Sequence, residues 1–273
     1  MAQSGGSNQT ASISIGGAPA KHTGIYIDGM PVNSHLTGEF DLNSIPKQAV
    51  KRIEVYTDGA AAEMGAGSLA GAVNIITRKA AFQGEFGFDQ NIGSYNSDET
   101  NLTVQNIFHE KLSGLFIFSR NTASNDFKYD DPKAGEIRRQ NNYRDLDSKY
   151  ASLNYKISQH DNIYMNFSYV RSRAGLPGAV YSLTPSAEKS ESFRTWNLGA
   201  DLSPLDNLML AVSTQHYLSH QHFTDYDTFI PYDSRYRDSR LSFNINSKYI
   251  ISPDHYLSAR LNLSFDRFQQ EYM

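Results

Sequence analysis

Residues 257–265 read Leu-Ser-Ala-Arg-Leu-Asn-Leu-Ser-Phe, so an apolar side chain recurs at almost every second position. This period of two is that of a β-strand, in which successive side chains point to opposite faces of the sheet. The alternation recurs in several upstream segments: residues 151–157, 163–169, 196–202 and 241–245. Counted by this periodicity, the chain from Phe82 onward holds about nine strands.

The composition narrows the class of protein. The 273 residues include no cysteine, which excludes disulfides and thiolate metal sites. The formal net charge of −4 comes without any run of Lys or Arg that would indicate a nucleic-acid surface. The chain has 17 Tyr and 15 Phe, yet its mean hydropathy is −0.51, which fits a soluble β-protein or an outer-membrane barrel with a polar interior. No stretch approaches the roughly 18 consecutive apolar residues of a spanning helix, but a spanning barrel remains open.

The connections between the expected strands alternate between short and long. Short polar turns are expected at residues 109–111, 159–162, 204–207 and 252–255. Long loops are expected at residues 124–146, 175–192 and 220–238. This asymmetry is typical of outer-membrane barrels, which have tight periplasmic turns and long extracellular loops.

An odd number of strands predicts that such a barrel is incomplete. Single-chain bacterial barrels have an even number of strands, and an open edge in lipid leaves backbone donors unsatisfied. Residues 257–270 read as a strand with no following partner, and Met1–Gly6 carries no secretory signal. We therefore expect a truncated barrel.

The first eighty residues have a different texture. They are rich in Gly, Ala, Ser and Ile, and short β-runs are expected at residues 12–15, 24–27, 52–56 and 72–77. Asp28-Gly29 and Asp58-Gly59 predict tight turns, and Ser44–Val50 predicts a helical turn or two. We expect a small α/β unit over residues 1–80, followed by the barrel strands over residues 81–273.

Glycines at residues 65, 67 and 71 would let backbone approach backbone where the small unit packs against the barrel wall. The alternative is that these glycines only allow turns in ordinary loops. A nucleotide-binding loop is excluded, because the spacing is wrong and a strand follows instead of a helix.

Four blocks in this first region carry a family resemblance: residues 25–33 (IYIDGMPVN), 41–46 (DLNSIP), 50–55 (VKRIEV) and 65–77 (GAGSLAGAVNIIT). In their order and spacing they resemble the plug domain of TonB-dependent outer-membrane receptors. The resemblance implies a mainly β fold, with the C-terminal part of a plug followed by the first strands of a partial transmembrane antiparallel barrel. It also implies a monomer in the bacterial outer membrane, in contact with lipid.

The chain departs from the family at Gly16 and Thr57, where the family usually carries arginines that pair with acids of the barrel wall. The usual ion pairs between plug and barrel are therefore not expected at these positions. The signal peptide, the TonB box and the front half of the plug are not found in the 273 residues either.

In the family, loops at the plug apex carry substrate. The matching loop is residues 33–40, and we predict substrate contacts from Asn33, Ser34, His35, Leu36 and Thr37. Residues 8–10 are expected to form a second apical loop. A solvated connection without ligand contact is the alternative.

Acidic residues gather in residues 224–239, where carboxylate oxygens could bind Ca²⁺ as a structural ion. The predicted calcium ligands are Asp225, Asp227, Asp233 and Asp238, and residues 125–132 offer further carboxylates. A solvated acidic loop is the favoured explanation, because no EF-hand spacing is present. No other cofactor is expected. His216, His220 and His222 share the parity of lipid-facing residues, so interfacial positions are favoured over metal ligation.

The resemblance implies active uptake of a scarce bulky nutrient, driven by the TonB–ExbB–ExbD complex. Residues 124–142, with Asp-Pro-Lys-Ala-Gly-Glu, are similar to the cobalamin-receptor branch, while ferric siderophore and haem remain open as ligands. No catalytic set is recognisable, so an enzyme is not expected. Two other hypotheses remain: a non-transporting outer-membrane barrel, such as an adhesin or a lipid-acting enzyme, and a nonfunctional gene fragment.

Overall fold

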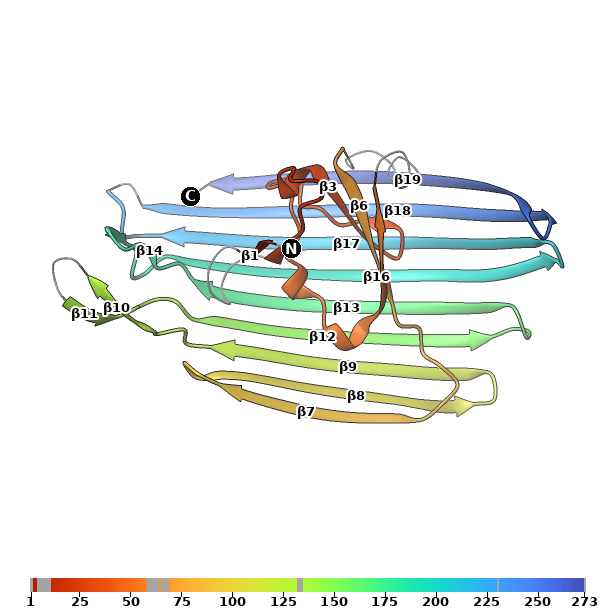
Figure 1. Cartoon of the computed structure of the whole chain (residues 1–273), viewed down its shortest axis with the longest axis horizontal. Coiled ribbons are helices and arrows are strands. Elements are labelled where there is room, and N and C mark those ends of the chain that lie inside the picture. The colour runs from red at the N-terminus through yellow and green to blue at the C-terminus, as the bar shows by residue number, and fades with distance from the viewer. Residues whose placement is uncertain are drawn as a thin grey trace.

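The computed structural model describes residues 2–3, 11–57, 64, 69–131, 135–229 and 231–272. Its main feature is one long, curved antiparallel sheet of nine strands, here called the wall, with a small domain lying against one face (Figure 1). The small domain is called the plug. Along the wall the order is β19-β18-β17-β16-β13-β12-β9-β8-β7, so each strand pairs with its neighbours in the chain. This confirms the mainly β class predicted from the alternation.

The wall strands lengthen toward the C-terminal end of the chain. Their bounds are β7 Glu85–Gly93, β8 Ser97–His109, β9 Leu112–Ala123, β12 Arg144–Lys156, β13 Asn162–Gly175, β16 Glu188–Leu205, β17 Leu208–Asp225, β18 Tyr232–Ser252 and β19 His255–Tyr272. A membrane crossing takes about 9–11 tilted residues, so the longest strands extend well beyond a lipid layer.

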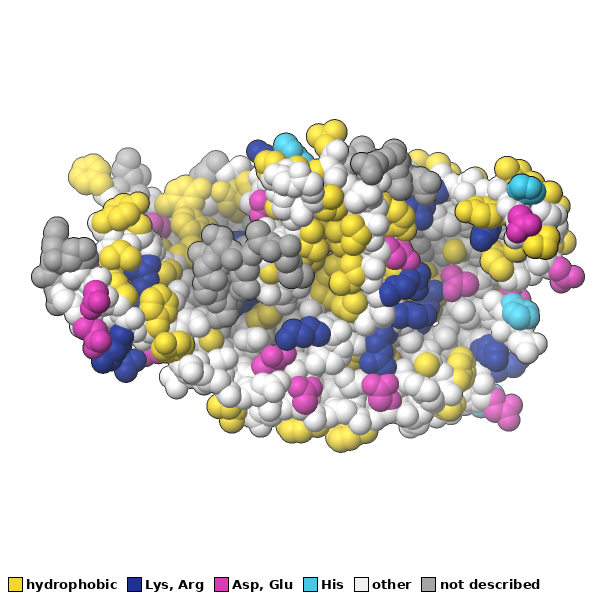
Figure 2. All heavy atoms as spheres, in the orientation of Figure 1, with side chains coloured by type: hydrophobic (Ala, Val, Ile, Leu, Met, Phe, Trp, Pro, Cys, Tyr) yellow, Lys and Arg dark blue, Asp and Glu magenta, His cyan; other side chains and the backbone are white. Residues whose placement is uncertain are grey.

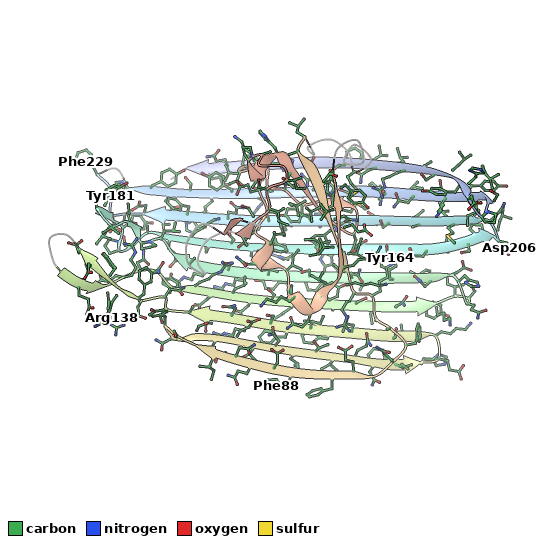
Figure 3. All side chains as sticks on the ribbon, in the orientation of Figure 1. Phe88, Arg138, Tyr164, Tyr181, Asp206 and Phe229 are labelled. Atoms are coloured by element: carbon green, nitrogen blue, oxygen red, sulfur yellow. The ribbon has the colours of Figure 1, made fainter. Side chains whose placement is uncertain are left out.

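The two ends of the wall differ as the turn pattern predicts. One end, the turn end, carries short connections and includes Asp206 (Figure 3). The other, the loop end, carries Arg138, Tyr181 and Phe229 (Figure 3). Two small hairpins form there, β10 Lys128–Asp131 with β11 Gly135–Arg138 and β14 Gly178–Ala179 with β15 Ser182–Leu183.

The loop expected over residues 220–238 is mostly strand. β17 continues to Asp225 and β18 begins at Tyr232, so only a short connection separates them. Likewise β16 begins at Glu188, inside the loop expected over residues 175–192. Beyond the lipid layer both faces of a strand are solvated, so the sequence loses the apolar contrast that reveals a strand.

Each wall strand presents one face to the plug and one away from it. The plug-side positions are largely amides and hydroxyls, such as Asn101, Gln105, Ser152, Asn166 and Asn197, which are buried. Polar side chains with scattered charges cover this face (Figure 2). The outward positions include Met165, Trp196, Leu198, Phe243 and Leu263, which are exposed in the isolated chain. The alternation therefore separates a polar interior from an apolar exterior.

The plug contains a four-stranded sheet in the order β4-β3-β6-β5. Its elements are β1 Ala2–Gln3, β2 Ala11–Ser12, η1 Ala20–His22, β3 Thr23–Ile27, β4 Met30–Pro31, η2 Leu42–Ser44, η3 Lys47–Ala49, β5 Val50–Tyr56 and β6 Gly71–Thr77. β3 and β6 run parallel, and β5 pairs antiparallel with β6. The helical turn or two expected at residues 44–50 takes the form of the 3₁₀ turn η3, and a second 3₁₀ turn, η2, comes just before it. The run expected at residues 12–15 shrinks to β2.

Two glycine positions show why the plug chain turns where it does. Asp28 and Gly29 have φ angles of 52° and 82°, which confirms the predicted left-handed turn between β3 and β4. Gly71 has a φ of 143°, and a Cβ there would lie 2.8 Å from the carbonyl oxygen of Tyr56. The turn expected at Asp58-Gly59, the glycines expected to allow close packing at residues 65 and 67, and the second apical loop expected at residues 8–10 lie outside the described residues.

The plug and the wall share one apolar core. Ile25, Val32, Phe40, Val73 and Ile75 of the plug pack with Leu146, Val170, Phe193 and Tyr217 of the wall. The Phe40 and Phe193 rings meet edge to face, with centroids 5.7 Å apart. The plug is thus held against the wall by apolar burial as well as by polar contacts.

Among the described residues, no helix is both long and apolar enough to cross a membrane.

Candidate binding site at the plug apex

The plug apex is the loop of residues 33–39, which follows β4 and projects toward the loop end. Asn33 fixes its shape: its side-chain oxygen accepts from Ile25 N at 2.6 Å, and its amide donates to the carbonyls of Thr23 and Gly38 at 3.0 and 2.8 Å. Gly38 N also donates to the Ser34 carbonyl at 2.8 Å. The structure therefore gives Asn33 a role inside the loop, with all its amide groups occupied by backbone.

His35 joins the apex to the wall. Its Nδ1 lies 2.9 Å from both carboxylate oxygens of Asp238, and its Nε2 lies 3.0 Å from Arg240 Nη2. Because Arg240 is a donor, Nε2 accepts from it and Nδ1 donates to Asp238. Asp266 Oδ2 also lies 3.5 Å from Nε2. Arg240 also donates to the Pro31 carbonyl at 2.6 Å and to Asp266 at 2.5 Å. Of the five predicted substrate residues, His35 is thus the one bound to the wall.

Ser34, Leu36 and Thr37 face space on the loop side of the plug. Ser34 and Thr37 border a hollow of about 100 Å³ against β13, β16 and β17. Leu36, 41% exposed, borders a wider hollow of about 460 Å³ with Phe223, Tyr232 and Tyr236. The structure therefore places these three predicted residues along two hollows on the loop side of the plug, which together we call the vestibule.

Aromatic groups of the wall shape the vestibule. The Phe223 and Tyr232 rings meet edge to face with centroids 5.2 Å apart, and the Tyr232 and Tyr236 hydroxyls are 3.0 Å apart. The Tyr236 ring stacks on Phe268 at 6.3 Å. Rigid rings with polar tips suit a bulky ligand that offers both apolar surface and hydrogen-bonding groups. The alternation pattern does not single out Phe223, Tyr232 and Tyr236, because they lie in the stretch expected to be loop.

Ion pairs join the plug to the wall at two places, one toward the loop end and one toward the turn end. Arg144 of β12 donates to Asp41 at 2.8 Å, and Asp41 also accepts from the backbone of Ala11 and Asn43. Lys79 pairs with Asp201 at 2.5 Å and lies 3.5 Å from the centre of the Tyr164 ring. These pairs join the plug to the wall although Gly16 and Thr57, where the resemblance implies arginines, carry no charge. An isolated Arg at a plug-side position of a polar strand, such as Arg144, is the signal that could have revealed them.

The connection from β6 to β7 is fastened to the wall by its backbone. Ala80 N donates to Ser152 Oγ at 3.0 Å, while its carbonyl accepts from Ser113 and Asn154 at 3.1 and 3.0 Å. Tyr150 donates to the Arg78 carbonyl at 2.5 Å. The point where the plug enters the wall is therefore fixed over several strands.

A buried carboxyl lies beneath the plug sheet. Asp28 accepts from Thr77 N at 2.8 Å and from Thr77 Oγ1 at 2.6 Å. Burial raises the pKa of Asp28 above its ordinary 3.8, although the Thr77 hydrogen bonds and Lys79 act in the opposite direction. On the plug surface, burial alone would raise the pKa of Glu54, but hydrogen bonds from Arg52, Tyr56 and Asn74 outweigh it and lower that pKa.

The four predicted calcium ligands do not converge. Asp238 points to the plug side and contacts His35, whereas Asp233 points outward and lies 2.8 Å from His222. Asp227 accepts from Ser186, and Asp225 accepts from the backbone of Asp227. Within the described ranges, no group of three or more His, Asp or Glu side chains is arranged to hold a metal ion.

The histidines of β17 stand on the outward face. His216, His220 and His222 alternate with Tyr217 and Ser219, which are buried on the plug side. This is the side that the parity argument predicts.

Residues 1–72 match the family model described as the TonB-dependent receptor plug domain. The chain thus carries a TonB-dependent receptor plug domain. It is accordingly an outer-membrane protein, with the plug inside the curve of the wall and the loop end facing the exterior. The vestibule of this receptor therefore opens outward, and the turn end of the wall faces the periplasm.

Among curated relatives, the vitamin B12 transporter BtuB of Vibrio vulnificus (strain YJ016) is 28% identical over 166 residues, which are 59% of this chain and 26% of that protein. The chain thus spans about a quarter of that relative. The modest identity gives the cobalamin-receptor branch only weak support.

Solved structures share the fold at low identity. The siderophore receptor PiuA of Acinetobacter baumannii has a TM-score of 0.74 at 13% identity, over 98% of this receptor and 41% of that chain. The ferripyoverdine receptor of the Pseudomonas aeruginosa outer membrane has a TM-score of 0.74 at 14% identity, over 91% and 36%. The copper transporter OprC has a TM-score of 0.75 at 12% identity, over 91% and 38%. These relatives are transporters and receptors.

Proposed function

We propose that this receptor takes part in TonB-dependent uptake of a scarce, bulky nutrient, cobalamin or a metal chelate, across the outer membrane. One observation carries the proposal. The plug apex presents Leu36 and Thr37 to an outward-opening vestibule, while ion pairs, among them the buried Arg144–Asp41 pair, fasten the same domain to the wall. A plug that is fastened to the wall and open toward the exterior suits capture from outside followed by forced rearrangement.

The chemistry of the vestibule supports a bulky ligand. Phe223, Tyr232 and Tyr236 supply rigid rings, and Leu36 adds an apolar contact from the plug. Ser34 and Thr37 supply hydroxyls, although each already accepts a hydrogen bond from loop backbone, at 3.1 and 3.2 Å. A corrinoid or an organic metal chelate combines ring surface with peripheral polar groups, and such surface is what stacking aromatics recognise. The names of the relatives, a vitamin B12 transporter, siderophore receptors and a copper transporter, support this class.

The contacts that fasten the plug to the wall support the proposal that opening a transport path requires energy. A path along the wall opens only if contacts such as Arg144–Asp41 and Lys79–Asp201 separate or the plug rearranges around them. Breaking a buried ion pair costs several kcal/mol, more than thermal motion supplies readily. We propose that TonB with ExbB and ExbD provides this work.

Uptake in a defined host tests the proposal. The receptor would be expressed in a strain that lacks its own cobalamin and siderophore receptors, and entry of labelled cyanocobalamin or of ferric siderophores would be followed with TonB present or deleted. We expect accumulation of one of these ligands that disappears without TonB. Surface binding without accumulation would indicate a receptor that does not transport, and no binding of either class would overturn the proposed cargo.

A further inference from the structure

Strand pairing aligns outward side chains into rungs that cross the wall. One rung near the loop end joins Arg171, Ser192, His220, Arg237 and Gln269, because each faces the next on the neighbouring strand. The adjoining rung toward the middle of the wall contains Arg194 and Arg267. Cationic side chains from separate strands are thereby brought together on one face.

Four of these arginines lack acidic partners. Among the residues that the structure describes, Arg171, Arg194, Arg237 and Arg267 form no ion pair, and all four are exposed. The carboxylates around them are engaged elsewhere: Asp147 with Arg120, Glu188 with Arg173, and Asp233 with His222. Glu271 lies opposite Arg235 on the next rung. The patch therefore keeps an excess of positive charge.

The patch lies directly beside the apolar band of the wall. The next rung inward is Phe167, Trp196, His216, Leu241 and Phe265, and mostly apolar rungs continue to Leu257. The nine residues from Leu257 to Phe265 are eight steps of about 3.4 Å apart end to end, so they span about 27 Å. That is close to the lipid-facing band of about 25 Å found in such barrels. Arg194 and Arg267 therefore stand at the depth of the lipid headgroups on the loop side.

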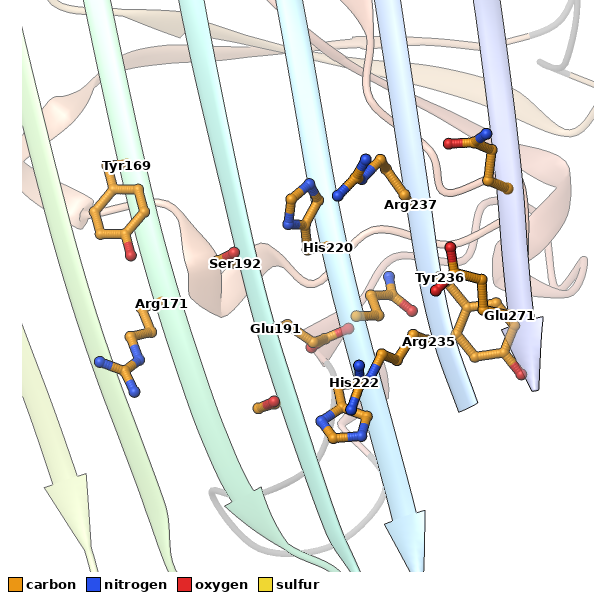
Figure 4. A pocket seen from close by; sticks show the side chains of 13 residues that line it. Tyr169, Arg171, Glu191, Ser192, His220, His222, Arg235, Tyr236, Arg237 and Glu271 are labelled. Atoms are coloured by element: carbon orange, nitrogen blue, oxygen red, sulfur yellow. The ribbon is translucent and has the colours of Figure 1, made fainter. Parts of the chain in front are cut away.

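The wall is hollowed at this patch. An open depression of about 440 Å³ lies between Arg171 and Arg237, with Ser190, Ser192 and His220 along it (Figure 4). Two carboxylates also line it: Glu191, which pairs with Lys189, and Glu271, which lies opposite Arg235. The Nε2 atom of His220 is buried and has no hydrogen-bond partner among the described residues. Guanidinium groups, hydroxyls and an imidazole together are a donor set suited to phosphate oxygens.

We propose that this outward patch, Arg171, Arg194, His220, Arg237 and Arg267, binds the phosphate groups of an anionic lipid headgroup in the outer leaflet. The proposal rests on the placement in the outer membrane and not on the nutrient. A nutrient in the vestibule cannot reach these side chains, since they lie on the opposite face of the wall from the plug. Unpaired cations beside an apolar band complement a molecule that has phosphates at one end and acyl chains at the other.

The test measures lipid retained by the purified, folded receptor in a neutral detergent. Lipid A with its phosphates and lipid A stripped of them would be titrated in parallel, with inorganic phosphate as a competitor. The charge-removed variant combines R171Q, R194Q, R237Q and R267Q. The matched control is R173Q with R120Q, on the same outward face but outside the depression, where each arginine has an acid within reach.

We expect the phosphorylated lipid to bind at least about tenfold tighter than the stripped lipid, with that preference weakened by salt. The charge-removed variant should lose the preference, and the control should keep most of it. Equal binding of both lipids, or an equal loss in the control, would overturn the proposal. Displacement by millimolar inorganic phosphate would show a free-anion site and would also overturn it. Unchanged migration of the folded variants in unheated gels verifies that the substitutions leave the wall intact.

Discussion

Arg144 of the wall and Asp41 of the plug are joined at 2.8 Å, with only 6% and 16% of their side chains exposed. Asp41 at the same time caps the 3₁₀ turn η2 and accepts from Ala11 N. One carboxylate therefore ties together two plug segments and one wall strand. A buried pair with this many contacts leaves a costly unpaired charge when either partner is lost.

We predict that R144M destabilises the attachment of the plug by about 3–5 kcal/mol, because Asp41 is left buried without its cation. Urea titration in detergent, read by protease sensitivity of the plug, measures this. The control R173M breaks the more exposed Arg173–Glu188 pair and should cost at most about 1 kcal/mol. The double variant D41N/R144M should recover part of the loss, and strictly additive losses would contradict the pairing.

The Gly71→Ala substitution should destabilise the plug by about 1–3 kcal/mol. A Cβ at this position would lie 2.8 Å from both the Tyr56 carbonyl oxygen and the Ile15 side chain, and the φ of 143° is strained for alanine. Thermal unfolding of the plug measures the effect. Gly84→Ala is the matched control, since a Cβ there meets nothing within 4 Å. An equal effect of the two variants would show that packing at Gly71 is looser than described.

Asp28 should make plug stability depend on pH. Its folded pKa is raised by burial above 3.8, so the folded protein holds this proton more tightly than the unfolded chain. The stabilisation is fully present below about pH 3.8 and is lost as the pH rises through the raised folded value. We expect D28N to flatten that decline, because asparagine tolerates the left-handed turn and stays neutral.

A second carboxyl provides the opposite sign for comparison. Hydrogen bonds from Ser158 and Ser203 lower the pKa of Asp161, in the turn between β12 and β13. Its stabilisation is present above the unfolded value and fades as the pH falls through the lowered one. D161N should therefore alter only the acidic limb of the unfolding curve. The same pH profile in both variants would refute the assignment of Asp28.

Removing vestibule aromatics should weaken nutrient capture. F223A and Y232A are each expected to lower affinity by about tenfold, since an aromatic contact at a binding site contributes on the order of 1 kcal/mol or more. Equilibrium binding to the folded receptor measures this. Y155A, an exposed tyrosine near the turn end, is the control and should bind as the parent does. Parent-like affinity in F223A and Y232A would move the binding surface elsewhere.

Chelation of calcium should leave the receptor's stability unchanged. Asp225 and Asp238 point to the plug side, while Asp233 lies on the outward face against His222, so the acids cannot surround one ion. Melting curves with EGTA and with added Ca²⁺ are expected to superimpose. A clear rise in melting temperature with Ca²⁺ would show that these loops rearrange around the ion.

The strands were predictable because the period of two is a local property. Residues 257–265 alternate wherever they are placed, and the Asp28-Gly29 turn depends on only two residues. The plug blocks likewise indicated the domain before any contact was known. A strand that spans a membrane alternates apolar and polar residues, and that alternation can be read directly from the sequence.

The contacts across the molecule were not predictable in the same way. Arg144 and Asp41 are 103 residues apart, so their meeting depends on how the plug sits in the wall. Asp233 and Asp238 are close in sequence but differ in parity, which sends them to opposite faces. Asn33 is of the residue type expected to bind a ligand, yet its side-chain amide is fully hydrogen-bonded to backbone groups of the plug.

The parallel pairing of β3 with β6 also governs how the plug responds to a pulling force. A pull on the chain ahead of Thr23 draws β3 backward along its axis, while the fastened connection after Thr77 holds β6 at its far end. Opposed forces along two parallel strands load all of their inter-strand hydrogen bonds at once, in shear, instead of breaking them one after another. The plug sheet is thus mechanically stiffest along this line, so that such a pull is transmitted to the side-chain contacts with the wall before β3 is stripped from its partner.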